Sequence, residues 1–331
     1  MTTIVPRVYR VAPSFGRLAP RCIPASVVVA PPRVAAMTRR GPIARYISSS
    51  RPVSSASSTP RPTNKGLLPE FDLRGKVIVV SGGAQGLGLV QAEALLEAGA
   101  TVHVLDRQPE PSSGSSYQKL SQRVRDELAD TSITYHQVDV RTGANELNSI
   151  VKEIADRHGR MDGLIAAAGI QQETSALEYT AADADRMLGV NVTGVLITAQ
   201  AVARQMVRFE RMGSLVLIAS MSGTVANRGL ICPVYNASKA AVIQLGRNLA
   251  MEWGPSGIRV NTISPGYIVT DMVKKLFEQY PEREIEWPKQ NMLGKLSKPE
   301  DYRGAAVFLL SDASRFMTGA DLRIDGGHAA W

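Results

Sequence analysis

Acidic residues are absent from the first 69 positions of this 331-residue sequence, and the first to occur is Glu70. Residues 1–66 carry ten arginines and one lysine among many Ser, Pro and Ala residues. Taking these eleven from the 38 basic residues leaves 27 against 30 acidic ones, a net charge near −3. The overall charge of +8 therefore belongs to the amino terminus, and the rest of the chain gives no sign of a nucleic-acid-binding surface.

The same acid-free, Arg- and Ser-rich composition is typical of organelle transit peptides. We expect residues 1–66 to be a mitochondrial transit peptide, cleaved or disordered, with a processing region near residues 45–50. This predicts a location in the mitochondrial matrix, or in the cytoplasm if the segment is not a working presequence. A plain disordered basic tail is the alternative interpretation.

Long apolar runs, cysteine pairs and metal-ligand spacings are also missing. The longest apolar run of the amino-terminal segment, residues 25–30, stops at Pro31 and is too short to span a membrane. Cys22 lies in this segment, so Cys232 would be the only cysteine of the mature chain and would have no internal partner for a disulfide. The four histidines are scattered, and we interpret each as structural or surface. We therefore expect no membrane span, no disulfide and no metal.

What the sequence does contain, from about residue 73, is a regular alternation of short β-branched apolar runs with helical patterns. The expected strands are residues 76–80, 101–105, 134–138, 163–167, 215–218, 260–264 and 322–324. This alternation predicts one parallel sheet with helices on both faces, a doubly wound α/β fold of the Rossmann type. Residues 70–331 make one such domain, in which residues 271–298 are expected to form a lid over the ligand.

Three glycines, Gly82, Gly86 and Gly88, follow the first expected strand and lead into a helix expected at residues 88–98. Glycine lets the backbone turn tightly and approach a pyrophosphate, which the amino-terminal N–H groups of the helix would bind. A glycine loop between a strand and a helix, with an acid after the next strand, is typical of a dinucleotide site. A tight turn without a ligand is the alternative.

The acid that ends the second expected strand is Asp106. Its carboxylate can accept hydrogen bonds from both adenosine ribose hydroxyls and repels a 2′-phosphate, so NAD(H) is favoured as cofactor. Arg107 beside it could instead bind that phosphate, which makes NADP(H) possible. Asp139, after the third strand, could reach the adenine amino group or simply cap the strand end.

Tyr235 and Lys239 are four residues apart, which places a phenol and an ammonium on one face of a helix. A neighbouring cation favours the phenolate, so the pair can move a proton at a carbinol or carbonyl oxygen. The spacing alone also fits a surface lysine beside a half-buried tyrosine.

Several motifs occur together in a fixed order: the glycine loop, Ala167-Ala168-Gly169, Asn191, Ser220, Tyr235 with Lys239, and Pro265-Gly266. In that order and spacing the chain resembles the classical short-chain dehydrogenase/reductases over essentially all of residues 70–331. One departure is the alanines at positions 166 and 167, where the family usually has asparagines. Their loss should weaken a hydrogen-bond network between strands rather than the chemistry.

The resemblance implies a catalytic tetrad. Tyr235 would exchange the proton with the substrate oxygen, and Ser220 would hydrogen-bond the same oxygen. Lys239 would lower the Tyr235 pKa and hold the nicotinamide ribose, while Asn191 would hold a water that links Lys239 to solvent. Ser222 is a rival for the role of Ser220, which we favour because it comes first after the strand.

Contacts to the cofactor are likewise implied by the resemblance. The backbone of Ile268 would meet the carboxamide of the nicotinamide, and Thr270 its amide or the phosphate. The expected cofactor-binding residues are Gly82, Gly86, Leu87, Gly88, Asp106, Arg107, Asp139, Val140, Ala168, Gly169, Asn191, Tyr235, Lys239, Pro265, Gly266, Ile268 and Thr270.

A closer likeness covers the segments around residues 166–172, 220–227 and 264–267 and the chain end from Ile324 to Trp331, which look like fungal polyol dehydrogenases and ketose reductases. That likeness implies a sugar alcohol and a ketose as substrates, of the D-arabinitol 2-dehydrogenase type. The candidate substrate residues are Gln171, Ser222, Asn227 and Tyr267, for which ordinary loop polarity or lid packing is the alternative.

Two other functions fit the same scaffold. One is a 3-oxoacyl-[acyl-carrier-protein] reductase, against which Asp106 argues because biosynthetic reductases usually need NADP. The other is a dinucleotide-binding sensor without catalysis, against which the complete tetrad argues. The helical patterns near residues 187–206 and 240–253 are apolar over more than one face, which suits subunit packing in a homotetramer or homodimer.

Overall fold

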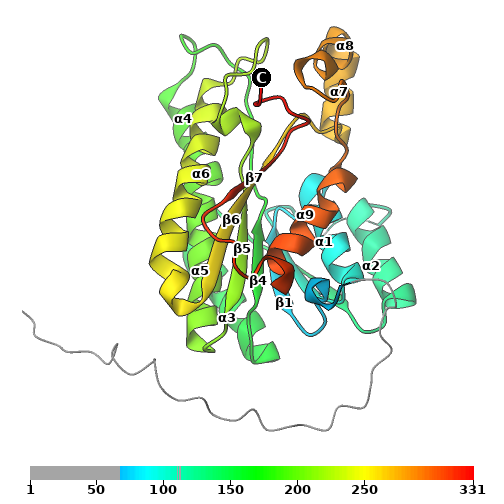
Figure 1. The fold of residues 1–331 in the computed structure, drawn as a ribbon, viewed down its shortest axis with the longest axis vertical. Helices are drawn as coiled ribbons and strands as arrows, with labels where there is room; N and C mark the ends of the chain where they lie inside the picture. The colour runs from blue at the N-terminus through cyan, green and yellow to red at the C-terminus, as the bar shows by residue number, and fades with distance from the viewer. Residues whose placement is uncertain (1–67, 110, 112) are drawn as a thin grey trace, which may run out of the picture. The chain divides into compact units, whose positions relative to one another are not determined.

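Seven parallel strands form one sheet in the order β3-β2-β1-β4-β5-β6-β7 within the part of the chain that the computed structural model describes, residues 68–109, 111 and 113–331 (Figure 1). The expected transit peptide lies outside the described residues. The strands are β1 (Val77–Ser81), β2 (Thr101–Asp106), β3 (Ser132–Gln137), β4 (Gly163–Ala166), β5 (Gly213–Ile218), β6 (Ile258–Pro265) and β7 (Asp321–Ile324). The predicted doubly wound α/β sheet is confirmed, and each strand begins and ends within two residues of its expected bounds.

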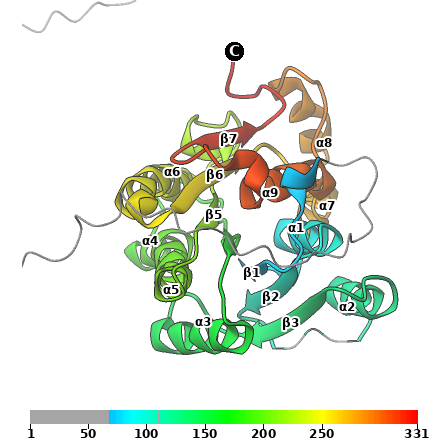
Figure 2. The same cartoon turned by 60° about the horizontal axis from the view of Figure 1, so that its bottom comes forward.

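Helices cover both faces of this sheet, with α1, α2 and α9 on one side and α3, α5 and α6 on the other (Figures 1 and 2). The helices are α1 (Gly86–Glu97), α2 (Ser116–Glu127), α3 (Ala144–His158), α4 (Ala181–Leu188), α5 (Val195–Arg208), α6 (Pro233–Trp253), α7 (Asp271–Gln279), α8 (Glu282–Glu286) and α9 (Arg303–Leu310). The expected lid region, 271–298, contains α7 and α8.

Strand β1 shows how the sequence builds the two layers. Its side chains alternate between the faces of the sheet. Val77 and Val79 pack with α3, α5 and α6, whereas Ile78 and Val80 pack with α1, α2 and α9. Both faces are covered, so the strand is apolar at every one of these positions rather than at every second one.

One helical stretch among the described residues, Ala181–Arg208, is long and apolar enough to cross a membrane. It consists of α4, a π-helical turn (Gly189–Gly194) and α5. Half of its apolar window is buried inside the fold. The side chains of α5 pack against the sheet and α3, so the need to fill the core accounts for this composition.

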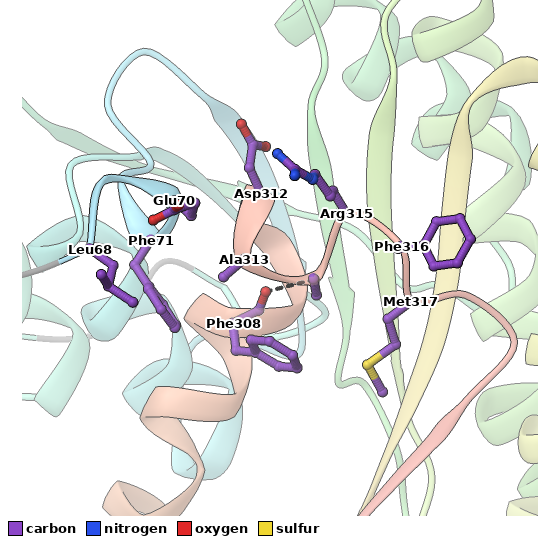
Figure 3. Close-up of a pocket in the computed structure, with 10 residues that line it drawn as sticks. Leu68, Glu70, Phe71, Phe308, Asp312, Ala313, Arg315, Phe316 and Met317 are labelled. Carbon is purple, nitrogen blue, oxygen red and sulfur yellow. Dashed lines mark hydrogen bonds between the residues drawn. The ribbon is translucent and has the colours of Figure 1, made fainter.

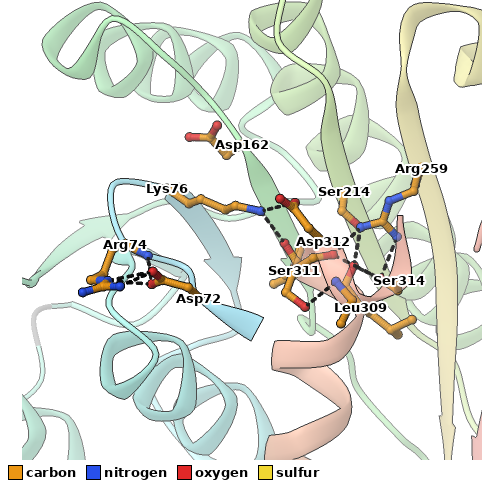
Figure 4. Close-up of polar contacts among 12 residues, drawn as sticks. Asp72, Arg74, Lys76, Asp162, Ser214, Arg259, Leu309, Ser311, Asp312 and Ser314 are labelled. Carbon is orange, nitrogen blue, oxygen red and sulfur yellow. Dashed lines mark hydrogen bonds and ion pairs between the residues drawn. The ribbon is translucent and has the colours of Figure 1, made fainter. Parts of the chain in front are cut away.

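The amino edge of the sheet, where the strands begin, is closed by paired polar groups (Figure 4). Arg259, at the start of β6, donates to Ser314 Oγ and to three backbone carbonyl oxygens at 2.9–3.2 Å. Asp162, 7% exposed, accepts from the Val77 amide at 2.9 Å and from the Arg160 guanidinium at 2.7 Å. These hydrogen bonds join the first residue of β1 to the residue before β4, and the beginning of β6 to the turn after α9.

Three of the four histidines meet although they are far apart in sequence. His103 Nδ1 lies 3.0 Å from His136 Nε2, and His103 Nε2 lies 3.0 Å from His158 Nε2. Burial lowers the pKa of His103 to about 3, helped by the charges of its two neighbours. His103 uses a different ring nitrogen for each neighbour, so the three rings do not converge on one point. The described residues contain no group of side chains able to hold a metal.

Candidate active site

The carboxyl edge of the sheet gathers the four residues of the expected tetrad. Ser220 follows β5, and Tyr235 and Lys239 lie one turn apart on α6. Asn191 lies in the π-helical turn between α4 and α5. Parallel strands end at a common edge, which brings segments far apart in sequence to one place.

Tyr235 lies between Ser220 and the apolar lid. Burial around its hydroxyl raises the pKa of Tyr235 to about 12, and a hydrogen-bonding interaction with Ser220 opposes that rise. Lys239 Nζ is 5.7 Å from the centroid of the Tyr235 ring. The expectation of a lowered Tyr235 pKa is wrong for the protein alone, because the phenolate loses more solvation than the nearby groups restore.

Lys239 is itself buried, with 5% of its surface exposed. Its Nζ donates to the carbonyl oxygen of Ile218 at 2.8 Å, which ties α6 to the end of β5. Burial lowers the pKa of Lys239 to about 8. A β-carbon at Gly169 would lie 3.6 Å from this nitrogen, so glycine keeps the loop after β4 close to the ammonium without covering it.

Asn191 has a structural task that its sequence motif did not predict. Its Oδ1 accepts from the Ile170 amide at 2.9 Å, and its Nδ2 donates to the Ile170 carbonyl and to Ser238 Oγ, both at 3.0 Å. The side chain is completely buried and joins the loop after β4 to α6. The additional residue of a π-helical turn changes where the side chains that follow it point. The expected water link to Lys239 stays a prediction.

Ser220 and Ser222 have different neighbours. Ser220 interacts with Tyr235, and its Oγ accepts from the Ser222 amide at 3.1 Å. Ser222 Oγ accepts from Asn227 Nδ2 at 2.6 Å. Asn227 Oδ1 is buried and has no hydrogen-bond partner among the described residues. The geometry therefore associates Ser220 with Tyr235, and Ser222 with an amide that has an unused acceptor.

The glycine loop has the shape that a dinucleotide requires. A β-carbon at Gly82 would lie 2.7 Å from the Ala168 backbone, and one at Gly88 would lie 2.4 Å from the Gly82 carbonyl oxygen. A β-carbon added at Gly86, where φ is +56°, would have no neighbouring atom within 4 Å among the described residues. Helix α1 has no side-chain cap at Gln85. The backbone N–H groups of Gly86 and Leu87 at an open helix start are suitable donors for a pyrophosphate, so the residues present fit the cofactor.

Asp106 and Asp139 stand at the ends of β2 and β3. Asp106 accepts from the Ala84 and Gln108 amides, both at 3.3 Å, which leaves carboxylate lone pairs for ribose hydroxyls. Arg107 is exposed. Asp139 Oδ1 accepts from the Arg141 amide at 2.8 Å, as a strand-end cap does. Val140 packs so closely on Gly194 that a β-carbon there would come within 2.7 Å of it.

The segment after β6 connects the sheet to the lid. Gly266 donates to the Ile324 carbonyl at 2.9 Å, and a β-carbon there would lie 2.8 Å from the Asp325 backbone. Ile268 pairs with Ser297 in an isolated bridge. Thr270 caps α7, since its Oγ1 accepts from the Val273 amide at 3.4 Å. Pro265, the last residue of β6, is paired with Ile324.

Aromatic side chains join the lid to Tyr235. The Tyr267 and Trp287 rings stack with centroids 4.2 Å apart and planes 9° apart. Trp287 and Phe277 belong to an apolar cluster against which Tyr235 packs. One face of Tyr267 is therefore covered by Trp287, and its hydroxyl donates to Gln290 Oε1 at 3.3 Å. These contacts are those of lid packing, the alternative interpretation, and substrate binding by Tyr267 stays a prediction.

Sequence reasoning missed an ion pair beside this cluster. The Arg283 guanidinium on α8 donates to both carboxylate oxygens of Glu173, at 2.9 and 2.7 Å. Glu173 lies in the loop after β4, two residues beyond the exposed Gln171, whose side chain hydrogen-bonds to Cys232. The two charged residues are 110 positions apart, and no local pattern in the sequence relates them.

A hollow of about 490 Å³ lies at the opposite, amino edge of the sheet (Figure 3). It is bordered by Phe71, Phe308, Phe316 and Met317, with Glu70 and Asp312 nearby. None of the expected site residues borders it. Its position excludes it as the place where the tetrad meets a substrate.

Comparison with known proteins places this arrangement in context. A family model described as enoyl-(acyl carrier protein) reductase matches residues 82–329. The chain is 39% identical over 267 residues to galactitol 2-dehydrogenase of Rhizobium johnstonii, covering 79% of this chain and 98% of that protein. It is 34% identical over 271 residues to the ribulose-forming D-arabinitol 2-dehydrogenase of Candida tropicalis, covering 80% and 96%.

A solved structure that is similar to this chain is a gluconate 5-dehydrogenase from Burkholderia cenocepacia in complex with NADP and tartrate. It is 30% identical in sequence and superimposes with a TM-score of 0.71 over 79% of this chain and 98% of its own.

Proposed function

The chain belongs to the short-chain dehydrogenase/reductase family of NAD(P)-dependent oxidoreductases that act on alcohols, and we propose that its own substrates are a sugar alcohol and the corresponding ketose. The named relatives include dehydrogenases of arabinitol and galactitol. A D-arabinitol 2-dehydrogenase-like reaction, between a secondary carbinol and a ketone, is the form that we favour.

The observation that carries this proposal is the unpaired amide oxygen of Asn227 next to Ser222. If the amide were turned over, its nitrogen would be unpaired instead. A buried polar atom without a partner costs about 1–3 kcal/mol, which a substrate hydroxyl can recover. Asn227 and Ser222 are 6% exposed, and the Ser222 amide donates to Ser220 Oγ. A polyol has hydroxyls on both sides of the reacting carbon and can meet such a group.

The reaction divides into a hydride and a proton. Hydride chemistry at the reacting carbon would be supplied by the nicotinamide when it is bound. In ketose reduction Tyr235, protonated at neutral pH because its pKa is about 12, donates its proton to the carbonyl oxygen. In the reverse direction the phenolate takes the proton back, and Ser220 stabilises the developing alkoxide by hydrogen bonding.

Lys239 and Asn191 position these groups. The Lys239 ammonium is anchored on the Ile218 carbonyl and, on this proposal, also holds the nicotinamide ribose. Asn191 fixes α6 against the loop after β4 through Ser238 and Ile170. We further propose that NAD(H) is preferred because Asp106 faces the ribose end of the glycine loop. Arg107 leaves NADP(H) as the alternative cofactor.

We also propose that the protein works in the mitochondrial matrix and as a homotetramer or homodimer. Composition of residues 1–66 supports the first proposal. The second is supported by exposed apolar side chains on the outer helices, among them Val207 at 55% and Met251 at 74% exposure.

A second candidate is reduction of a 3-oxoacyl group on an acyl carrier protein. The description of the matching family model favours a carrier-bound acyl substrate, since it names an enoyl-(acyl carrier protein) reductase, although that reaction reduces a carbon–carbon double bond and not a ketone. Asp106 argues against it because of the NADP preference of biosynthetic reductases. The third candidate, a sensor that binds the dinucleotide without turnover, is opposed by the assembled tetrad.

Steady-state assays separate the three candidates. The mature chain would be tested with arabinitol, galactitol, mannitol, sorbitol, xylitol, their ketoses and an acetoacetyl thioester, each with NAD(H) and NADP(H). We expect turnover of at least one polyol with NAD(H) and little turnover of the thioester. Activity with the thioester alone would favour the carrier reductase, and cofactor binding without any turnover would favour the sensor.

A further inference from the structure

The Glu173–Arg283 pair connects the lid to the loop after β4. Two N–H groups of the guanidinium meet the two carboxylate oxygens at 2.9 and 2.7 Å, the bidentate geometry that suits this pair of groups. The Arg283 side chain is only 12% exposed, and that of Glu173 is 33% exposed. The guanidinium carbon also lies 4.4 Å from the centroid of the Tyr280 ring and 5.6 Å from that of Trp287.

This pair borders the region of the catalytic tyrosine. Trp287, which Arg283 touches, is part of the apolar cluster that packs on Tyr235. Both charges act electrostatically on Tyr267, and Glu173 also acts on Cys232. The pair therefore lies at the border of the apolar cluster that packs on Tyr235.

The pairing decides which substrate charge the site accepts. Arg283 is a cation of the lid whose two-nitrogen face suits a carboxylate, and that face is occupied by Glu173. A carboxylate that approaches meets the negative charge of Glu173 instead. Neutral hydroxyls meet carboxylate lone pairs that can accept further hydrogen bonds. The arrangement combines attraction for one class of substrate with repulsion of the other.

Resting on the polyol function proposed above, we propose that Glu173 is a specificity-determining residue that keeps Arg283 occupied, so that the site takes neutral polyols and rejects sugar acids. A covered guanidinium that loses its carboxylate is left as an uncompensated charge. It then binds another planar, two-oxygen anion, and the carboxylate of a sugar acid has that form. Removing the charge of Glu173 therefore opens the site to acids.

The kinetic test compares D-sorbitol with D-gluconate, two six-carbon polyhydroxy compounds of which only the second is an anion. The ratio of kcat/KM for gluconate to that for sorbitol would be measured with NAD⁺ and NADP⁺ for the wild type and Glu173→Gln. The matched control is Glu178→Gln, in which an exposed carboxylate of the same loop is removed. We expect the ratio to rise on the order of tenfold in Glu173→Gln, because a charged contact is exchanged, and to stay constant in the control.

The double variant Glu173→Gln/Arg283→Gln assigns the gain to the freed guanidinium. It is expected to return the ratio to the wild-type value, and far-UV circular dichroism checks that each variant is folded. An unchanged ratio in folded Glu173→Gln, or an equal rise in Glu178→Gln, would overturn the proposal.

A binding measurement decides the matter without turnover. Gluconate is expected to raise the Tm of Glu173→Gln more than that of the wild type or of Glu178→Gln, whereas sorbitol shifts all three equally. If the wild type oxidises no polyol, the proposed function fails, and the gluconate shift still tests the ion pair by itself. Equal gluconate shifts in all three proteins would overturn the charge selection even if polyols prove to be substrates.

Discussion

The two edges of the sheet use polar groups in opposite ways. At the amino edge Arg259 has four acceptors, and Asp162 binds both a strand amide and an arginine (Figure 4). At the carboxyl edge Asn227 keeps an unpaired oxygen, and Lys239 is buried with a lowered pKa. Helix α1 begins there without a side-chain cap. At the amino edge these polar groups are paired within the protein. At the carboxyl edge polar groups remain available to a ligand.

The difference indicates that the polar groups that stabilise the fold and those that serve activity lie at opposite edges of the sheet. Unpaired buried groups cost folding free energy, so they persist where a substrate or cofactor uses them. Paired groups at the far edge stabilise the same strands without touching the chemistry. Variants at the carboxyl edge should therefore change turnover. Variants at the amino edge should change the free energy of unfolding without changing turnover.

The largest expected effect is at the carboxyl edge. Tyr235→Phe removes the hydroxyl that carries the proton, and we expect kcat to fall by about 10³-fold or more. Cofactor binding and the thermal midpoint should stay close to wild type. Tyr280→Phe, which alters an outer lid tyrosine, is the control. The assignment of Tyr235 fails if its variant keeps more than a few per cent of activity.

The next effect concerns Lys239 and pH. Its pKa is about 8 in the folded chain against the ordinary 10.5, so between these values the unfolded chain binds more protons than the folded one. The contribution of Lys239 to the free energy of unfolding therefore rises with pH between about 8 and 10.5. Relative to Lys239→Met, the wild type should gain up to about 3 kcal/mol of unfolding free energy from pH 8 to pH 10.5.

Denaturant titrations at several pH values measure this difference. Above pH 10 Tyr235 acts in the opposite sense, because its raised pKa makes the folded chain bind more protons than the unfolded one. Both proteins share that contribution. A constant difference between them across pH 8–10 would contradict the lowered Lys239 pKa.

The amino edge supplies the third test. Arg259→Met removes four hydrogen bonds, one to Ser314 Oγ and three to carbonyl oxygens that keep other donors, which should cost about 2 kcal/mol of unfolding free energy. The kcat of the folded fraction should not change. The exposed Arg315, changed to Met, is the matched control at the same edge. A loss of kcat in Arg259→Met with unchanged stability would break the separation between the two edges.

The smallest expected effect is at Asn227. Asn227→Ala removes a substrate contact but also an unpaired buried oxygen, so kcat/KM for a polyol should fall about tenfold while stability stays level or rises. Asn248→Ala, on the exposed side of α6, is the comparison. If kcat/KM is unaffected while stability drops, the Asn227 amide is a structural group and does not bind substrate.

Features with a local cause could be predicted from the sequence. The strands follow from apolar runs, the glycine loop from three residues within seven positions, and the Tyr235/Lys239 pair from helical spacing. Each depends on residues that are neighbours along the chain. The fold class followed from these signals, whereas the tetrad was implied by the family resemblance that the ordered motifs carry.

Features with a tertiary cause could not be predicted in this way. The direction of the Tyr235 pKa depends on how deeply the lid buries the hydroxyl, which spacing does not encode. The contact between Glu173 and Arg283 and that among His103, His136 and His158 join separate parts of the chain. The π-helical turn at Asn191 looks like continuous helix in the sequence pattern.

The sheet order has a consequence for the time course of folding. Strand β1 is bordered by β2 and β4, and the Asp162 carboxylate that holds the Val77 amide is 85 residues away. A loop of that length must close before the centre of the sheet is complete, and such non-local pairings form slowly. During synthesis the chain can assemble β1 to β3 first, but β1 stays unpaired on one side until β4 has left the ribosome.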